Sequence, residues 1–149
     1  LTASVGINVG AQQLPRAKMI AWTGAFISFC VVGLLGATVT IFPDVWLNNF
    51  ESSTLIRDYA TSYLIIVAPF YCFFAAGQTL YFASQGLGKI FYPVIVGIIR
   101  LLSVSIICYY VTFYDLSLNF VFYGVSFGLL ATGLGLWMCM LGPDWKKQI

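Results

Sequence analysis

Residues 19–43, MIAWTGAFISFCVVGLLGATVTIFP, decide the fold class, because this apolar stretch contains no charged residue from end to end. A bilayer core of about 30 Å is crossed by about 20 residues of α-helix, so the stretch is long enough to span a membrane. Three more apolar windows follow: residues 59–88 and 116–143 are also uncharged, and residues 91–114 are interrupted only by Arg100. The sequence therefore predicts an all-α integral membrane protein with four full transmembrane helices, the second of them bent at Pro69.

The composition supports a membrane environment. Of 149 residues, 60% are hydrophobic and 8% are charged, whereas soluble domains carry about a quarter charged residues. A net charge of +2 is too small for binding nucleic acid through its phosphates, so no nucleic-acid partner is expected. The lipid bilayer is the expected surroundings of the chain.

Residues able to support enzyme chemistry or metal binding are scarce. The chain has no His, which excludes Ser-His hydrolysis and His-ligated metals within it. Cys30, Cys72, Cys108 and Cys139 each lie inside a separate apolar run, so they are interpreted as buried apolar residues. We expect neither an enzyme nor a resident cofactor or metal.

Basic residues fall on alternate connections between the predicted spans. One set of connections carries Arg16, Lys18, Lys89, Lys146 and Lys147. The other carries only Arg57, in a connection that also contains Asp44, Glu51 and Asp58. The positive-inside rule then predicts that the loops of the first set and the C-terminus are cytoplasmic, in a plasma membrane or bacterial inner membrane.

Two short motifs carry a family resemblance. Residues 5–12, VGINVGAQ, precede Arg16-Ala17 and an apolar helix. Further on, Tyr63-Leu64 and Ala68-Pro69 are followed by residues 83–88, ASQGLG, and then by Arg100. In order and spacing these motifs resemble the multidrug and toxic compound extrusion (MATE) transporters, over nearly the whole chain.

The resemblance implies a place for the chain in a larger carrier. MATE proteins have twelve helices in two related lobes. Residues 1–13 would be the end of a truncated transmembrane helix, the family's helix 8, and residues 14–149 would be helices 9–12 of the C-terminal lobe. The chain is then expected to be a fragment, with the missing N-terminal lobe as its partner. Gly6 with Gly10, and Gly124 with Gly128, are expected to pack helices together.

One face of the helix after Pro69 is the candidate substrate site. Residues at spacings of three and four share a helical face, and aromatic and amide side chains recur here at those spacings: Tyr71, Phe74, Gln78, Tyr81 and Gln85. Such a face suits flat, partly cationic organic substrates through stacking and cation-π attraction. The alternative interpretation is ordinary helix packing.

Arg100 is the sixth candidate for the cavity. It lies nine residues after Phe91, which is about 13 Å along a helix and close to mid-membrane. A charge there costs about 2.5–3.5 kcal/mol on translocon scales, so Arg100 is expected to face a wet cavity or a carboxylate. Alternatively its long side chain reaches back toward the cytoplasm.

The resemblance implies a secondary antiporter that exports organic, often cationic, drugs or metabolites in exchange for Na⁺ or H⁺. Some family members carry a coupling carboxylate in the tenth helix, where this chain reads Tyr71-Cys72-Phe73-Phe74-Ala75-Ala76 and has no acid. The coupling-ion site is therefore expected outside this chain. One alternative is a lipid-linked saccharide flippase, although phosphates usually require several basic residues. The other is a non-transporting four-helix membrane subunit.

The basic-residue pattern makes a prediction about orientation. In intact cells, an impermeant thiol reagent should label Asn48→Cys and leave Lys89→Cys unlabelled until the cells are opened, because Lys89 belongs to the cytoplasmic set. The background is measured in a parent that lacks the native cysteines. Labelling of Lys89→Cys from outside, with none at Asn48→Cys, would reverse the orientation.

Overall fold

The computed structural model describes residues 1–49, 53–142 and 145, and the secondary structure of this described part is entirely helical. The prediction of an all-α membrane protein is confirmed. The elements in chain order are α1 (Thr2–Gly10), α2 (Leu14–Ile41), α3 (Pro43–Leu47), α4 (Thr54–Val67), the 3₁₀ turn η1 (Ala68–Phe70), α5 (Tyr71–Gly86), α6 (Phe91–Phe113) and α7 (Asn119–Leu141).

Four helical segments are long and apolar enough to cross a membrane: Leu14–Ile41, Thr54–Gly86, Phe91–Phe113 and Asn119–Leu141. The first begins earlier than the uncharged window, because Pro15 stands in the first turn of α2, where a missing N–H costs no hydrogen bond. Arg16 and Lys18 therefore lie in the first turns of this helix. The short helix α3 was not foreseen from the sequence.

The predicted bend at Pro69 is confirmed, and it divides the second span into α4 and α5. Proline has no N–H to donate, so the α-helical bonding pattern gives way to the 3₁₀ turn of residues 68–70. Neighbouring groups compensate. Ser126 of α7 donates a hydrogen bond to the carbonyl oxygen of Ile66 (2.9 Å), and the hydroxyls of Tyr63 and Tyr71, on either side of the turn, lie 2.9 Å apart and share a hydrogen bond.

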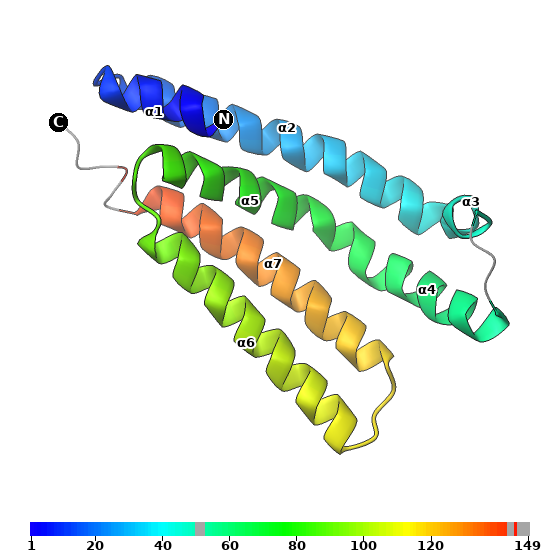
Figure 1. Cartoon of the computed structure of the whole chain (residues 1–149). Helices are drawn as coiled ribbons and strands as arrows, with labels where there is room; N and C mark the ends of the chain where they lie inside the picture. The colour runs from blue at the N-terminus through cyan, green and yellow to red at the C-terminus, as the bar shows by residue number, and fades with distance from the viewer. Residues whose placement is uncertain (50–52, 143–144, 146–149) are drawn as a thin grey trace.

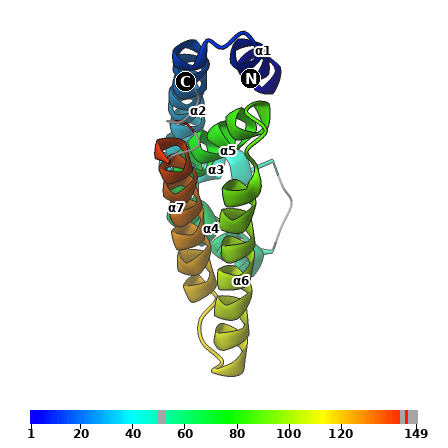
Figure 2. The same cartoon turned by 90° about the vertical axis from the view of Figure 1, so that its left-hand side faces the viewer.

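Helix α5 is at the centre of the bundle. It packs against α2 on one side and α7 on the other, α6 packs on the far side of α7, and α1 folds back along α2 and α5. Figure 1 shows α2, α5, α7 and α6 following one another across the molecule, and Figure 2 shows α1 set beside the start of α2. The connections from α1 to α2 and from α5 to α6 lie at the same end of the bundle as the end of α7.

The contact between α2 and α5 is built from small side chains. Ala17, Ala21 and Ala25 recur at every fourth position of α2 and are buried in one cluster with Ala76 and Ala83 of α5. In lipid, where apolar burial gives no extra driving force, such small residues allow two helices to approach closely. Thr79 of α5 adds a polar contact by donating a 2.8 Å hydrogen bond to the hydroxyl of Ser28 in α2.

Glycines make the contacts of α7. A Cβ added to Gly77 would lie 2.7 Å from the Cα of Gly133, so α5 and α7 approach closely at these two positions. Gly124 and Gly128 receive Ile107 and Val104 of α6, which confirms their expected packing role. Of the N-terminal pair, Gly6 faces the carbonyl oxygen of Gly86, whereas a Cβ at Gly10 would have no neighbour within 4 Å. Gly10 therefore makes no helix contact in the described part.

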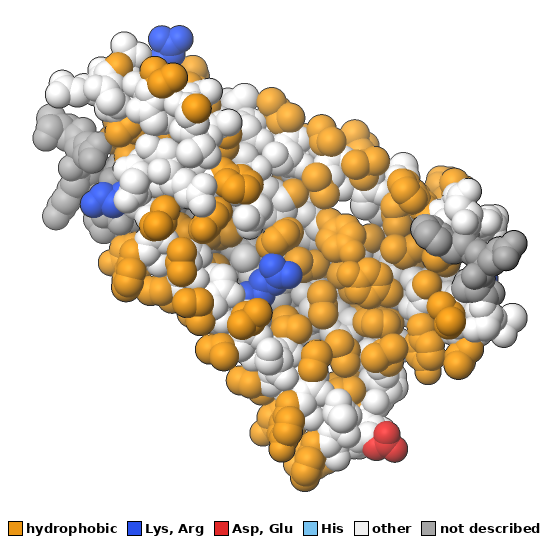
Figure 3. Space-filling model, in the orientation of Figure 1, with side chains coloured by type: hydrophobic (Ala, Val, Ile, Leu, Met, Phe, Trp, Pro, Cys, Tyr) orange, Lys and Arg blue, Asp and Glu red, His pale blue; other side chains and the backbone are white. Residues whose placement is uncertain are grey.

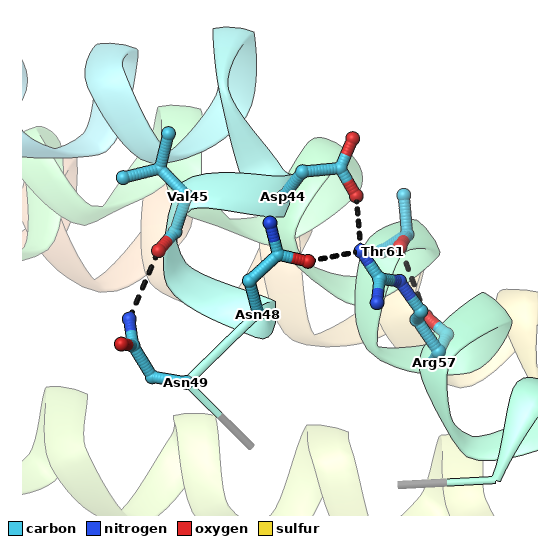
Figure 4. A network of polar contacts seen from close by, with 6 residues as sticks. All are labelled: Asp44, Val45, Asn48, Asn49, Arg57 and Thr61. Atoms are coloured by element: carbon cyan, nitrogen blue, oxygen red, sulfur yellow. Dashed lines mark hydrogen bonds and ion pairs between the residues drawn. The ribbon is translucent and has the colours of Figure 1, made fainter. Parts of the chain in front are cut away.

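The end of the bundle opposite the α5–α6 connection is held by a polar network (Figure 4). Arg57 of α4 donates hydrogen bonds to Asp44 (2.8 Å) and to the side-chain oxygen of Asn48 (2.6 Å). Thr61 donates to the backbone oxygen of Arg57, one turn earlier in the same helix. The contacts join α3 and its C-terminal end to α4. Glu51, predicted for this connection, lies outside the described residues, as do Asp144, Lys146 and Lys147.

The outer surface is apolar, as the four spans require. Large hydrophobic side chains are exposed along α2 and α6, for example Leu34 (70%) and Leu101 (68%). Figure 3 shows hydrophobic side chains spread over the whole of one face, with basic atoms near its middle. A soluble monomer rarely exposes so large an apolar surface. Lipid is the solvent that this surface fits, so the chain is an integral membrane protein.

The Gly77–Gly133 crossing yields a stability prediction. Gly77→Ala should lower the level of folded protein in the membrane, because the nearest atoms to the added methyl are backbone atoms of Gly133, which cannot move aside as a side chain can. Overpacking of this kind costs about 1–3 kcal/mol. Gly97→Ala is the matched control, since a Cβ there meets nothing within 4 Å. Detergent thermal melts and membrane levels measure both. Equal melting temperatures for the two variants would contradict the close crossing.

Candidate functional site

A groove of about 410 Å³ runs between α5 and α6, with α7 as its floor. We call it the α5–α6 groove. It exists because α6 packs on α7 and scarcely touches α5. Its lining residues are Phe74, Gln78, Tyr81, Pro93, Val94, Gly97, Ile98, Arg100, Leu101, Thr132 and Leu136.

The sequence of α5 explains why its polar and aromatic residues reach the groove. Phe74, Gln78 and Tyr81 recur at spacings of four and three and share one face. Another face carries Ala76 and Ala83, which are buried in the contact with α2. The small-residue face is used for packing, so the aromatic face remains half-buried along the groove.

The opposite wall comes from one face of α6. Pro93, Gly97 and Arg100 recur there at helical spacing. Gly97 has no side chain and no neighbour within 4 Å of an added Cβ, so it widens the groove one turn before Arg100. The guanidinium carbon of Arg100 lies 4.6 Å from the centroid of the Phe74 ring. This cation-π contact joins the two walls across the groove.

The guanidinium of Arg100 lies level with the middle of the second span. Phe74, the ring that it covers, is in the first turn of α5, beside the bend in the middle of the second span. The side chain therefore does not reach back to the membrane surface. Arg57 pairs with Asp44 at one end of the bundle, and no described acidic side chain lies against Arg100. Of the two surroundings expected for Arg100, a wet cavity or a carboxylate, the structure shows a groove, with the Phe74 ring beside the guanidinium.

Four of the six residues singled out from the sequence thus meet in the groove: Phe74, Gln78, Tyr81 and Arg100. Tyr71 does not, because its hydroxyl pairs with that of Tyr63 at the bend. Gln85 is exposed near the end of α5 and is not part of the groove lining. Residues that share one face of α5 therefore lie in three places: the bend, the groove and the exposed end of the helix.

The floor of the groove was missed by sequence reasoning. Thr132 is buried in α7 and donates its hydroxyl hydrogen bond to the backbone oxygen of Gly128 (2.6 Å). Nothing in the sequence of α7 marks Thr132, since a hydroxyl bonded within its own helix is common in membranes. Gly97 could have been found, because Pro93, Gly97 and Arg100 together form one unusual face of an otherwise β-branched and Leu-rich helix.

The chemistry of the groove lining suits the binding of a small organic molecule. It combines two aromatic rings, an amide, a phenol hydroxyl and one guanidinium with aliphatic walls. Pockets with apolar walls and a few placed polar groups are typical of sites for small organic molecules. Across the described residues, no group of three or more His, Cys, Asp or Glu side chains could hold a metal.

Comparison with protein families supports this architecture, whereas neither the curated proteins nor the solved structures gave a match. A protein-family model described as MatE matches residues 1–111, which is more than half of the chain and includes α1 to α5 and nearly all of α6. The chain therefore belongs to the MatE family of membrane transporters, the multidrug and toxic compound extrusion family.

Proposed function

We propose that this chain is part of a secondary active antiporter that exports organic, often cationic, compounds in exchange for Na⁺ or H⁺. The observation that carries the proposal is the α5–α6 groove at mid-membrane, where Phe74, Gln78 and Tyr81 present rings and an amide. Carriers of this general kind bind substrate near the bilayer midplane, between two structural repeats. The family membership supports transport as the activity.

A second lobe is proposed as the partner that completes the cavity. The groove is open along one side, because α6 packs mainly on α7 and leaves the aromatic face of α5 only half-buried. In a two-lobed carrier the N-terminal lobe would cover this side. The chain is then one part of the C-terminal lobe, with residues 1–13 as the end of family helix 8 and residues 14–149 as helices 9–12. The basic loops and the C-terminus face the cytoplasm.

The coupling-ion site is proposed to lie on that other lobe. The groove lining contains no acidic residue. Asp44, Asp58 and Asp115 lie at the ends of helices or in connections, outside the middle of any span. A carboxylate that binds Na⁺ or H⁺ within the membrane must therefore come from residues beyond the described part of the chain.

A lipid-linked saccharide flippase is the nearer alternative. Its phosphates would require several charge-assisted hydrogen bonds, and Arg100 is the only basic residue in the lining of the groove. The aromatic and amide residues outnumber it. The groove composition therefore favours an organic molecule with a ring system.

Trimming the groove should change substrate range more than protein level. Phe74→Ala and Gln78→Ala, in the complete carrier, should shift resistance to several cationic dyes, because each removes a contact worth about 1 kcal/mol, or about fivefold in binding. Membrane level is measured beside dye efflux. The matched control is Phe73→Ala on the same helix, whose ring packs edge-on against Phe29 of α2 with centroids 5.4 Å apart.

The control separates binding from packing. Phe73→Ala should lower the amount of carrier and reduce efflux of all dyes in proportion, because it removes a ring from the contact between α5 and α2. If Phe74→Ala behaves in the same way, the aromatic face is only a packing surface, and the groove is not the substrate site.

Tyr71 should behave differently from the groove residues. Tyr71→Phe removes the hydroxyl that bonds to Tyr63 and should lower thermal stability by about 0.5–1.5 kcal/mol. The dye profile should stay as in the parent, because Tyr71 is not part of the groove lining. A melting curve and an efflux profile measure the two effects. A changed profile at unchanged stability would place Tyr71 in the substrate path.

A further inference from the structure

We propose that the α5–α6 connection binds the headgroup of an anionic phospholipid from the leaflet that meets this end of the bundle. The proposal goes beyond the proposed function and concerns neither the α5–α6 groove nor its substrate. It is carried by three observations: a hollow at the connection that contains a lysine, exposed rings beside that lysine, and the separation of basic from acidic residues between the two ends of the bundle.

The hollow follows from the way α5 ends. Gly88 has a φ of 76°, in the left-handed region, and its N–H donates to the carbonyl oxygen of Gln85 (3.0 Å). The N–H of Lys89 donates to the carbonyl oxygen of Ser84 (3.0 Å), so the chain turns sharply before α6 begins. A Cβ added to Gly88 would meet nothing within 4 Å, so the space beside it is open. The resulting cavity of about 330 Å³ is lined by Gly88, Lys89, Ile90, Phe91 and Tyr92.

Lys89 supplies the positive charge of the hollow. It is exposed, and an ammonium has three N–H donors. Lys89 also interacts within the protein, but three donors allow it to bind a phosphate oxygen at the same time. The hydroxyl of the exposed Tyr92 is a further donor in the lining. No acid is among the described residues of the lining. An anion is therefore the ligand that this lining fits.

The residues after Lys89 indicate that the anion belongs to a lipid. Ile90, Phe91 and Tyr92 are 48%, 71% and 57% exposed, at the start of the apolar span of α6. Exposed rings at the end of a span are typical of the membrane–water interface, where headgroups meet acyl chains. A phospholipid there can set its phosphate beside Lys89 and its chains along these apolar side chains. A free phosphate would gain nothing from them.

Charge is divided between the two ends of the bundle. The end with the α5–α6 connection carries the described bases Arg16, Lys18 and Lys89. The described acids lie at the opposite end: Asp44, which is paired with Arg57, Asp58 and Asp115. Figure 3 shows basic side chains at the upper left of the molecule and an acidic side chain at its lower end. Basic residues beside a span attract anionic lipids, so the leaflet at the basic end offers the complementary headgroups.

The test measures lipid binding to the complete carrier in detergent by native mass spectrometry. Phosphatidylglycerol is compared with phosphatidylcholine of the same acyl chains, so that the two probes differ only in the headgroup. The wild type should bind phosphatidylglycerol more tightly. Lys89→Gln should lower the affinity for phosphatidylglycerol about fivefold, which corresponds to about 1 kcal/mol, and leave that for phosphatidylcholine unchanged. Lys89→Arg should keep the wild-type preference, because it keeps the charge.

Two control variants remove the same charge elsewhere. Arg57→Gln acts at the opposite end of the bundle and should leave the preference unchanged. Arg16→Gln acts at the same end, in the first turn of α2, which Figure 1 shows separated from α6 by α5 and α7. Its effect should be smaller than that of Lys89→Gln, because Arg16 is not part of the lining. An equal effect would assign the binding to the general charge of this end and overturn the proposed site.

Gly88 provides a matched pair that leaves Lys89 in place. Asn and Asp tolerate a positive φ better than most residues, and their side chains differ in charge but hardly in size. Gly88→Asn and Gly88→Asp should therefore reach the membrane at equal levels. Gly88→Asp should bind phosphatidylglycerol about fivefold more weakly than Gly88→Asn, or about 1 kcal/mol, because its carboxylate would lie beside the bound phosphate.

The proposal requires both effects. Equal phosphatidylglycerol affinities in Lys89→Gln and the wild type, or in the two Gly88 variants, would overturn it, and so would a wild type that binds both lipids equally. Inorganic phosphate is the last probe. If phosphate alone binds to the wild type in detergent and this binding is lost in Lys89→Gln, the hollow is a site for a free anion and not for a lipid. None of these outcomes changes the case for transport, which the efflux measurements test separately.

Discussion

The close approach of α5 to α2 and α7 is the contact on which the rest of the structure depends. Lipid tails are as apolar as Leu side chains, so helices in a bilayer associate through close packing and polar contacts and not through the hydrophobic effect. Alanines at every fourth position of α2 and the pair Gly77–Gly133 make that packing possible. With these faces of α5 used for contact, its aromatic face is left to line the groove. The site is thus a consequence of how the helices pack.

Polar groups within the spans are nearly all satisfied locally. Thr132 donates to Gly128, and Ser103 donates to Ile99, each within its own helix. Ser126 and Thr79 reach across to neighbouring helices. In the absence of water each unmatched polar group would cost several kcal/mol. Arg100 departs from this pattern, because its one described partner is an aromatic ring.

Much of the fold follows from the sequence, because its determinants are local. Long uncharged runs fix the spans, and Pro69 fixes the bend, since both act within a single helix. The site was predictable only in part. Spacing places Tyr71, Phe74 and Gln85 on one face, but the bend turns Tyr71 toward Tyr63, and the helix end leaves Gln85 exposed. Thr132 belongs to the groove lining only because α7 packs between α5 and α6, and that packing depends on contacts between segments far apart in the sequence.

The bend at Pro69 has a mechanical consequence for the second span. Helix α5 packs on α2 through the buried alanines of both helices. Helix α4 is joined to α3 by the side chain of Arg57 and to α7 by the hydroxyl of Ser126. Both halves of the span nevertheless contact α2 and α7, with a 3₁₀ turn between them. The hydrogen bond between the hydroxyls of Tyr63 and Tyr71 bridges this turn. Phe74 lies in the first turn of α5 beyond the bend, so the angle of the bend sets where its ring meets the groove.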